Sequence, residues 1–439
     1  MILLLGTVQA AAFYTANPGA RAMGRGGAYI VGNHDISAQY YNPAALRNIQ
    51  GGHAKFDFGF VGQTVSFTRD GYDPVENSGA LYKIPSLGVA WGGERATLAF
   101  GLYSPYAPAF LYPEDGPQRY SMIDSTLIQT SVGPSASFDV LPWLTLGGGI
   151  AWMTNTVGRQ VVLTTSGGDD PAGDIALDLL VTDWFGVGGQ VAASVHPTDL
   201  WEVAVSVQLP SRFDGKGALE ADFSSNGFYA SGIILDPIAR DDEVTLDIKM
   251  PLILRGGVAL RPNEKLELEL SGDYGRWSGF DEIVITDIDL VVDVDDTNPL
   301  FPDGDPSITD DVTLPSTYQD SWSVRLGGEY GVHERLDVRA GLIYESSAVP
   351  LEIMTVDLVD GNKFGGGVGV TPHIGAVSID VGVFAMKLAD QTITNSKVHQ
   401  VKIDVLDGKV TEGDVIGNGR YESLIYTAAV GLEYRFGQR

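Results

Sequence analysis

The stretch that decides the fold lies at the end of the chain and reads Ser423-Leu424-Ile425-Tyr426-Thr427-Ala428-Ala429-Val430-Gly431-Leu432-Glu433-Tyr434-Arg435-Phe436. Every second residue from Leu424 to Phe436 is apolar, whereas the other face carries small or charged residues at Ser423, Thr427, Gly431, Glu433 and Arg435. Because the side chains of a strand point alternately to its two faces, one face suits hydrocarbon and the other tolerates water. The stretch therefore predicts a β-strand between an apolar and a polar environment.

The same alternation recurs at 201–209, 266–270, 322–330 and 336–344. A soluble sheet that turns one face to its own core is the alternative to a sheet whose apolar face meets lipid. Aromatic residues near the ends of these stretches favour lipid, since Trp and Tyr gather at membrane interfaces.

Composition narrows the class further. The 439 residues suffice for several soluble domains or one large closed barrel, and the 55 glycines suit the bends and close packing of a barrel wall. No apolar run reaches the roughly 18 residues of a membrane-spanning helix, so a membrane protein of this sequence has to be a barrel. The chain has no cysteine, which suits the bacterial envelope but is also common elsewhere.

The chain is strongly acidic, with 56 acidic and 28 basic residues and a net charge of −28. Such a surface argues against nucleic-acid binding and against attachment to anionic lipid through basic patches. The acids gather in predicted loops, notably 293–311, where solvated loops are the simpler interpretation and Ca²⁺ binding is the alternative. No stretch has EF-hand spacing, so we predict no metal site.

The first 53 residues lack strand alternation. Residues 1–12 are expected to be the remnant of an export signal, because a short apolar core is followed by small residues before Phe13; a truncated start or a buried first strand is the alternative. Residues 13–53 form a segment rich in small residues, with a short helix expected over 35–46. Asp35 is a plausible N-cap of this helix and Pro43 ends it.

Two groups of motifs carry a resemblance to a known family. The first group, near the start, comprises Ala20-Arg21-Ala22-Met23-Gly24-Arg25-Gly26-Gly27-Ala28, Asp35-Ile36-Ser37-Ala38 and Tyr41-Asn42-Pro43-Ala44-Ala45-Leu46. The second comprises Trp277-Ser278-Gly279-Phe280, Arg325-Leu326-Gly327-Gly328-Glu329-Tyr330 and Leu336-Asp337-Val338-Arg339-Ala340-Gly341. In this order they resemble the FadL/TodX (OMPP1) family of outer-membrane transporters for long-chain fatty acids and other hydrophobic compounds. The resemblance covers nearly the whole chain.

The resemblance implies an all-β protein of the Gram-negative outer membrane, a monomeric transmembrane antiparallel β-barrel of about 14 strands. Residues 54–439 would form the barrel and residues 13–53 a plug, or hatch, in its lumen. Extracellular loops are expected at 107–125, 158–184, 212–242, 285–319 and 390–420, and periplasmic turns at Pro142 and His333-Glu334. Strands are expected to begin near Ala54, Ala80, Arg95, Thr126, Trp143, Phe185, Leu200, Glu243, Glu264, Asp320, Arg335, Phe364, Ala376 and Tyr421.

The function that the resemblance implies is passive uptake of long-chain fatty acids or other hydrophobic compounds. The extracellular loops capture the ligand, the plug rearranges, and the ligand leaves sideways through a gap in the wall into outer-membrane lipid. Sideways exit is physically reasonable, because hydrocarbon is preferred to water by about 0.8 kcal/mol for each CH₂.

Three sets of residues are candidates for this function. The plug would use Arg21, Gly24, Asn42, Pro43 and Ala44, with an ordinary turn before the first strand as the alternative. The lateral opening would involve Phe100, Gly101 and Pro105, because proline cannot donate to a ladder and glycine lets a strand bend; the simple end of a strand is the alternative. Ligand contact is expected from Tyr106, Phe110, Leu111, Tyr112 and Arg119.

Each ligand-contact candidate also has a simpler interpretation. The aromatic stretch at 106–112 is equally consistent with an interface belt or a loop core. Arg119 and Arg159 are possible partners of a ligand carboxylate, but an arginine in a lumen more often pairs with an acid of the chain. Acidic loops repel anions, so neutral hydrocarbons and aromatic compounds are alternatives to fatty acids.

Other function classes fit less well. The sequence has no Gly-x-Ser-x-Gly motif and its six histidines show no His-x-x-x-His spacing, so we predict no enzyme, no catalytic residues and no cofactor. A general porin, or a structural barrel without a specific hydrophobic ligand, is the alternative to a transporter.

Overall fold

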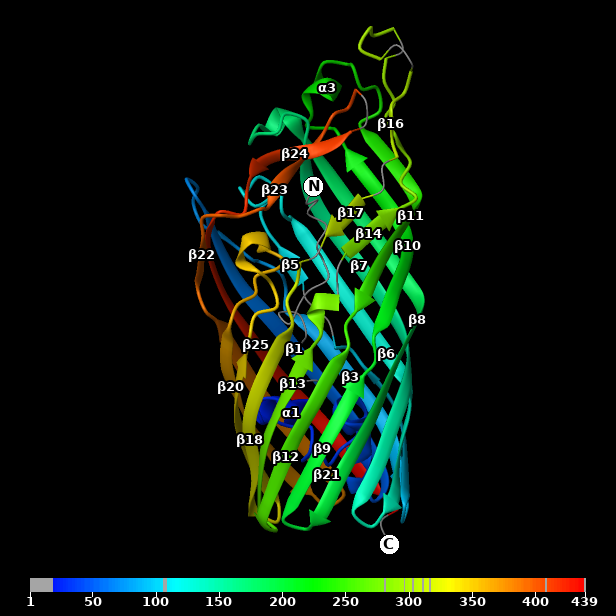
Figure 1. Ribbon diagram of the computed structural model, residues 1–439, viewed down its shortest axis with the longest axis vertical. Helices are drawn as coiled ribbons and strands as arrows, with labels where there is room; N and C mark the ends of the chain where they lie inside the picture. The colour runs from blue at the N-terminus through cyan, green and yellow to red at the C-terminus, as the bar shows by residue number, and fades with distance from the viewer. Residues whose placement is uncertain are drawn as a thin grey trace.

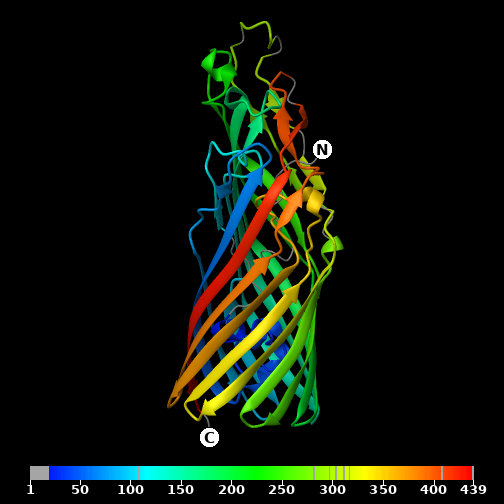
Figure 2. The same cartoon turned by 90° about the vertical axis from the view of Figure 1, so that its left-hand side faces the viewer.

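The alternating strands close on themselves into a barrel (Figures 1 and 2). The computed structural model describes residues 19–105, 109–279, 282–295, 297–301, 304–309, 312–315, 317–406 and 409–437. Each strand of the wall pairs antiparallel with the next, and the last pairs with the first over Gly52↔Phe436 to Arg69↔Gly419. The 14 strands of the wall are β1 (Gly51–Arg69), β3 (Tyr82–Gly92), β4 (Ala96–Tyr103), β6 (Asp124–Leu141), β7 (Leu144–Thr164), β8 (Asp174–Thr198), β9 (Trp201–Gln208), β12 (Ile253–Asn263), β13 (Leu266–Gly275), β18 (Ser321–His333), β19 (Leu336–Glu345), β20 (Lys363–Ile374), β21 (Val377–Leu388) and β25 (Gly419–Phe436).

The outer face of the wall is apolar and the inner face is largely polar. In β25, Leu432 and Tyr434 are exposed, whereas Ser423 and Glu433 are buried. A water-soluble protein shows the opposite arrangement, so the exposed belt matches hydrocarbon. The predicted antiparallel membrane barrel is therefore confirmed. Among the described residues, no helix is long and apolar enough to cross a bilayer.

The two ends of the barrel differ. At one end, the short-turn end, the connections comprise only 93–95, 142–143, 199–200, 264–265, 334–335 and 375–376. At the other, the long-loop end, the chain runs through extended segments that rise above the wall (top of Figure 1). Outer-membrane barrels have short periplasmic turns and longer extracellular loops, which orients the molecule.

At the long-loop end, strands that are not part of the closed ring extend the sheet. β8 pairs with β10 (Ser211–Asp222), and the order continues through β11 (Ile238–Met250) and β14 (Glu282–Thr286) to β17 (Val312–Pro315). The remaining short strands of the structure are β2 (Val75–Glu76), β5 (Ala109–Leu111), β15 (Leu290–Val291), β16 (Ser307–Ile308), β22 (Gln391–Ile393), β23 (His399–Ile403) and β24 (Val410–Val415).

This extension corrects two predictions. The expected loop 158–184 is mostly strand, because β7 and β8 continue to Thr164 and from Asp174. The strand expected near Glu243 is β11 of the extension, and the wall strand in its place is β12, which begins at Ile253. Alternation identifies a strand, but it does not show whether the strand belongs to the closed ring or to the extension. In β11 the alternating residues Leu246 and Ile248 face an internal apolar cluster and not lipid.

The N-terminal segment, residues 19–49, lies inside the barrel at the short-turn end, where Figure 1 shows α1 in blue. It contains α1 (Ala20–Gly24), α2 (Ala38–Tyr41) and the 3₁₀ helix η2 (Pro43–Asn48). The helix expected over 35–46 is thus split in two, and Ser37, not Asp35, is the N-cap of α2. Asp35 instead accepts from the Ser37 N–H at 2.8 Å in a turn. The remaining helices are η3 (Pro171–Gly173), α3 (Gly227–Ala230), η4 (Trp277–Gly279) and η5 (Leu351–Ile353).

Candidate functional site

One buried ion network fixes α1 to three strands of the wall. Arg21 Nε lies 2.8 Å from Asp380 Oδ1 on β21, and Arg21 Nη2 lies 3.2 Å from Glu433 Oε2 on β25. Lys55 on β1 pairs with Asp35 of the N-terminal segment and with Asp380 at 3.1 Å. All five side chains are almost completely buried. Because a buried charge without a partner is costly, this network holds the segment in one position.

A second network holds the segment to β13. Arg25 Nη1 lies 2.6 Å from Glu267 Oε1, and Arg25 Nη2 lies 3.4 Å from Glu269 Oε2. Glu269 also accepts the backbone N–H groups of Ile30 at 2.7 Å and Gly32 at 2.8 Å. Carboxylates that accept both backbone and guanidinium hydrogen bonds are among the strongest polar anchors.

The charge state of Asp35 follows from its partners. Burial raises the pKa of this carboxyl, but the cations Lys55 and Arg21 outweigh burial and hold the pKa below its ordinary value. Asp35 therefore stays ionised at neutral pH and keeps its pairs.

His34 gives the segment a weak pH dependence. Its Nε2 lies 3.1 Å from Glu267 Oε2; burial lowers the pKa of His34, but the Glu267 carboxylate outweighs burial and raises it. A raised pKa in the folded state stabilises the fold fully below the unfolded value of 6.5, and this stabilisation is lost as the pH rises through the folded pKa. Because the side chain is 38% exposed, solvent screens the pair and the effect is small.

We expect the wild-type thermal midpoint to fall more between about pH 6 and about pH 9 than that of His34→Gln. The measurement is thermal unfolding of both proteins in the same detergent at both pH values. Equal pH dependence of the two midpoints would show that the His34 pair contributes nothing.

The wall positions against which α1 packs are glycines, so the backbone of α1 lies directly on the backbone of the wall. We call Gly327, Gly341, Gly367, Gly369 and Gly382 the glycine seat; Gly327, Gly341 and Gly367 are direct neighbours across β18, β19 and β20. A Cβ atom on Gly341 would meet the carbonyl oxygen of Arg25, and one on Gly367 that of Met23. A Cβ on Gly24 itself would lie 2.9 Å from Gly369 Cα. Glycine is required on both sides of this contact, because any side chain would force the two backbones apart.

Asn42 links α2 to η2, and Pro43 and Ala44 are the first two residues of η2. Asn42 Oδ1 accepts from the Ala44 N–H at 3.0 Å, and Asn42 Nδ2 donates to Ile30 O at 2.9 Å and to Ser194 Oγ of β8 at 3.3 Å. The amide thus caps η2 and ties it to the wall, while Pro43 occupies the first helical position, where its missing N–H costs nothing.

Above α1 the lumen holds an inner apolar cluster. It combines wall residues with side chains from five other segments: α1, β2, the stretch 110–122, the loop between β19 and β20, and β22. Its members are Ala20, Met23, Val65, Phe67, Val75, Ile84, Phe110, Tyr112, Met122, Ile343, Met354, Val356, Val359, Phe384, Met386, Leu388, Ile393, Tyr421, Ile425 and Ala429.

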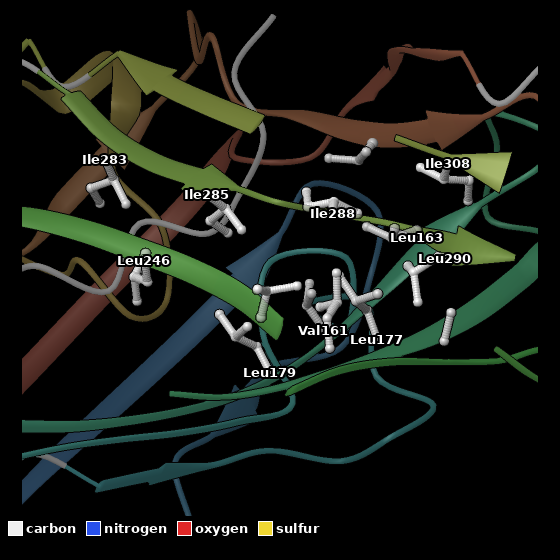
Figure 3. Close-up of a cluster of buried hydrophobic side chains, with 14 of the residues drawn as sticks. Val161, Leu163, Leu177, Leu179, Leu246, Ile283, Ile285, Ile288, Leu290 and Ile308 are labelled. Carbon is white, nitrogen blue, oxygen red and sulfur yellow. The ribbon is translucent and has the colours of Figure 1, made fainter. Parts of the chain in front are cut away.

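An outer apolar cluster continues this one towards the long-loop end. Figure 3 shows side chains of β7, β8 and β11 turned towards those of β14 and of the segment from Ile288 to Leu290. Ala348, Val349 and Leu358, from the same loop between β19 and β20, belong to it. Apolar side chains thus extend from the long-loop end down to α1.

The predicted ligand contacts fall on both sides of the wall. Phe110 and Tyr112 are buried, with ring centroids 6.5 Å apart, whereas Leu111 between them is exposed. Arg119 Nε lies 2.8 Å from Asp174 Oδ2, so its charge already has a carboxylate partner. Tyr106 lies outside the described residues.

The wall ladder is interrupted beside the predicted lateral opening. β3 pairs with β4 from Leu87↔Leu102 to Gly92↔Thr97, and β4 pairs with β6 up to Tyr103↔Ser131. Pairing with β6 resumes at Ala109↔Thr126 in β5. In the described part of the chain, 82–86 of β3 and 127–130 of β6 therefore have no ladder partner on the sides that face each other.

The candidates for the opening border this interruption. Phe100 is an exposed outward residue of β4, and Pro105 follows the end of that strand. The Gly101 carbonyl accepts from Gln39 Nε2 of the N-terminal segment at 3.4 Å. A small cavity of about 30 Å³ lies here, between the N-terminal segment at Ile36, Gln39 and Tyr40 and the wall strands β1, β3 and β4.

Nothing in the sequence indicated that the loop between β19 and β20 folds inward. Arg159 on β7 pairs with an acid of the chain, which was its simpler interpretation, but that acid is Asp357 of this loop, at 2.5 Å. The run of apolar residues at 348–359 was the only available signal, and it does not reveal that the loop turns inward.

A closed antiparallel barrel with an apolar outer belt and its own N-terminal segment in the lumen defines the class of filled β-barrels of the bacterial outer membrane. The family described as outer membrane protein transport protein (OMPP1/FadL/TodX) matches residues 1–436, and the chain belongs to it. The predicted family and outer-membrane location are thus confirmed.

Similar solved structures share this fold. A FadL homologue of Pseudomonas aeruginosa superposes with a TM-score of 0.74 at 18% identity, covering 97% of this chain and 100% of that one. The toluene transporter TodX of Pseudomonas putida gives 0.71 at 16%, covering 97% and 100%. The toluene transporter TbuX of Ralstonia pickettii gives 0.65 at 15%, covering 96% and 99%. No curated protein sequence matches the chain.

Proposed function

We propose that the protein is a passive transporter, not an enzyme, that carries small hydrophobic molecules across the outer membrane as a monomer. The single observation that supports this most is that the loop between β19 and β20 places buried apolar side chains in both clusters and so joins them into one apolar column, which reaches Met23 of α1. An apolar molecule moving along this column exchanges one apolar surface for another at every step, so no step exposes it to water.

The N-terminal segment is the proposed plug, and the interrupted ladder between β3 and β6 is the proposed exit. Arg21, Gly24, Asn42, Pro43 and Ala44 position the plug, and Phe100, Gly101 and Pro105 border the exit. The hydrogen bond from Gln39 to the Gly101 carbonyl links the two, so a shift of the plug changes the edge of the opening. A ligand that leaves here enters lipid directly, which avoids the cost of hydrating its apolar surface.

The described ion pairs favour a neutral ligand over a charged one. The cations Arg119, Arg159 and Lys363 each pair with an acid of the chain. A fatty acid would have to displace one of these carboxylates, whereas a hydrocarbon or an aromatic compound displaces none. Two relatives are described as toluene transporters, which agrees with this choice. Phe110 and Tyr112, whose side chains are buried in the inner cluster, remain the proposed contacts, whereas Leu111 points away from it.

Proteoliposomes that contain the purified protein should take up a radiolabelled monoaromatic hydrocarbon in a saturable manner and should not swell in arabinose. Protein-free liposomes give the passive background, and a known open porin is the positive control for swelling. Rapid swelling without saturable hydrocarbon uptake would establish the general porin instead. Competition by a long-chain fatty acid then tests the preference for neutral ligands.

A further inference from the structure

The connection between β19 and β20, residues 346–362, turns into the barrel; we call it the inner loop. Apart from Leu351, which is exposed, its large apolar side chains are buried or partly buried, with Met354 at 0% and Val356 at 1% exposure. Met354, Val356 and Val359 belong to the inner apolar cluster, whereas Ala348, Val349 and Leu358 belong to the outer one and Ile353 packs against it. The inner loop therefore lies across the apolar column where the two clusters meet.

Polar contacts fasten the inner loop to the barrel. Asp357 Oδ2 lies 2.5 Å from Arg159 Nη1 on β7, and each side chain is 1% exposed. The Tyr112 hydroxyl donates to Val356 O at 3.1 Å, and the Tyr421 hydroxyl, which donates to Gly417 O at 2.9 Å, lies 3.4 Å from Met354 O. These contacts come from different parts of the wall, so they pin the loop in the middle of the lumen.

At its end, Asp360 closes the loop on itself. Its carboxylate accepts the Ala348 N–H at 2.7 Å and pairs with Lys363 on β20. Lys363 also lies 3.0 Å from Glu345 on β19. This second ion pair fixes the base of the loop, whereas Asp357 fixes its centre.

We propose that the inner loop occupies the inner ligand site, and that Met354 and Val356 set the size of the apolar molecule the site accepts while Asp357 positions them there. This inference rests on the proposed function. The space around Phe110, Tyr112 and Tyr421 is already filled by loop side chains, so a ligand enters only by replacing them. The exchange of apolar side chains for an apolar ligand is nearly neutral, which leaves the Asp357–Arg159 pair as the main resistance.

Because the chain has no native cysteine, a single introduced cysteine can be labelled selectively. A single Met354→Cys variant reports the position of the loop through its rate of labelling by a membrane-impermeant maleimide added outside. Adding Asp357→Asn should raise this rate roughly tenfold or more, since tenfold represents about 1.4 kcal/mol and loss of a buried ionic partner exceeds that. The neutral amide keeps the size of the side chain and removes its charge.

Glu352→Gln in the Met354→Cys background is the matched control. Glu352 lies on the same loop and pairs with Lys397 at 2.6 Å, but this pair is exposed, so the labelling rate should not change. Val356→Cys gives a second reporter if Met354→Cys folds poorly, and heat-modified migration on gels checks folding of every variant. Equal labelling of the Asp357→Asn and Glu352→Gln proteins would overturn the proposal.

The second measurement is the size of the ligand that the protein transports. A loop with a purely structural role would not affect this size preference. In proteoliposomes, Met354→Ala should shift the preference towards larger aromatic compounds relative to toluene, whereas Leu351→Ala, an exposed position of the same loop, should not. An unchanged preference with normal uptake overturns the role of the inner loop. Absence of uptake in wild type as well overturns the proposed function, and the labelling rates then still report whether Asp357 holds the loop.

Discussion

Replacing Arg21 with glutamine is expected to turn the closed barrel into one that conducts ions steadily in a planar bilayer. The guanidinium compensates Asp380 and Glu433, which are buried on the inner face of β21 and β25. Removing one partner from a buried ionic network costs about 3–5 kcal/mol, because the remaining charges lose their compensation. Ladder hydrogen bonds hold the wall strands in place, but the N-terminal segment is not part of a ladder. We therefore expect the segment, and not the wall, to move.

Arg47→Gln is the matched control for this variant. Arg47 lies on the same segment and its Nε is 3.2 Å from Asp139 Oδ1, but both side chains are 25% exposed. Loss of this pair should cost no more than about 1 kcal/mol, and the conductance should stay at the wild-type level. A closed Arg21→Gln channel with wild-type stability would refute the view that this network holds the N-terminal segment in place and that the segment closes the barrel.

Gly341→Ala is expected to have the second largest effect. The added methyl group would meet the carbonyl oxygen of Arg25 and lie 2.9 Å from the backbone nitrogen of Gly26. Gly341 pairs with Gly327 on one side and Gly367 on the other, so the wall cannot retreat. Overpacking of this kind costs about 1–3 kcal/mol, and α1 should move off the glycine seat. Hydrogen exchange of residues 20–30 should become faster and the conductance should rise.

Gly256→Ala is the matched control, because a methyl group added at this wall glycine would not meet the N-terminal segment. Gly256 is also in a wall strand, but the nearest atom to an added Cβ is Ala204 O at an ordinary 3.6 Å. Exchange of the N-terminal segment should be unchanged in this variant. If both alanine variants behave like wild type, the seat has more room than the backbone contacts indicate.

The strand pattern was predictable because the bilayer imposes it. Each wall strand faces lipid on one side, so period-two alternation marks it, as in β25. The same signal failed for β11, where Leu246 and Ile248 alternate because they face an internal cluster. Alternation reports a difference between two environments and does not say which environment lies outside.

The site was less predictable, because its parts meet across long stretches of chain. Asp357 and Arg159 are 198 residues apart, and no local pattern links them. Within the segment 110–112 the period of two applies, which places the rings of Phe110 and Tyr112 on one side and Leu111 on the other. Treating all three as one ligand surface ignored this alternation.

The pairing of β25 with β1 has a consequence for biogenesis. The seam of the cylinder joins the first wall strand to the last, so it seals only when β25 is available to pair with β1. Arg21 and Glu433, 412 residues apart, meet next to this seam. Closure of the ring by β25 therefore also completes the ion network of Arg21, which couples the last step of assembly to the placement of the N-terminal segment.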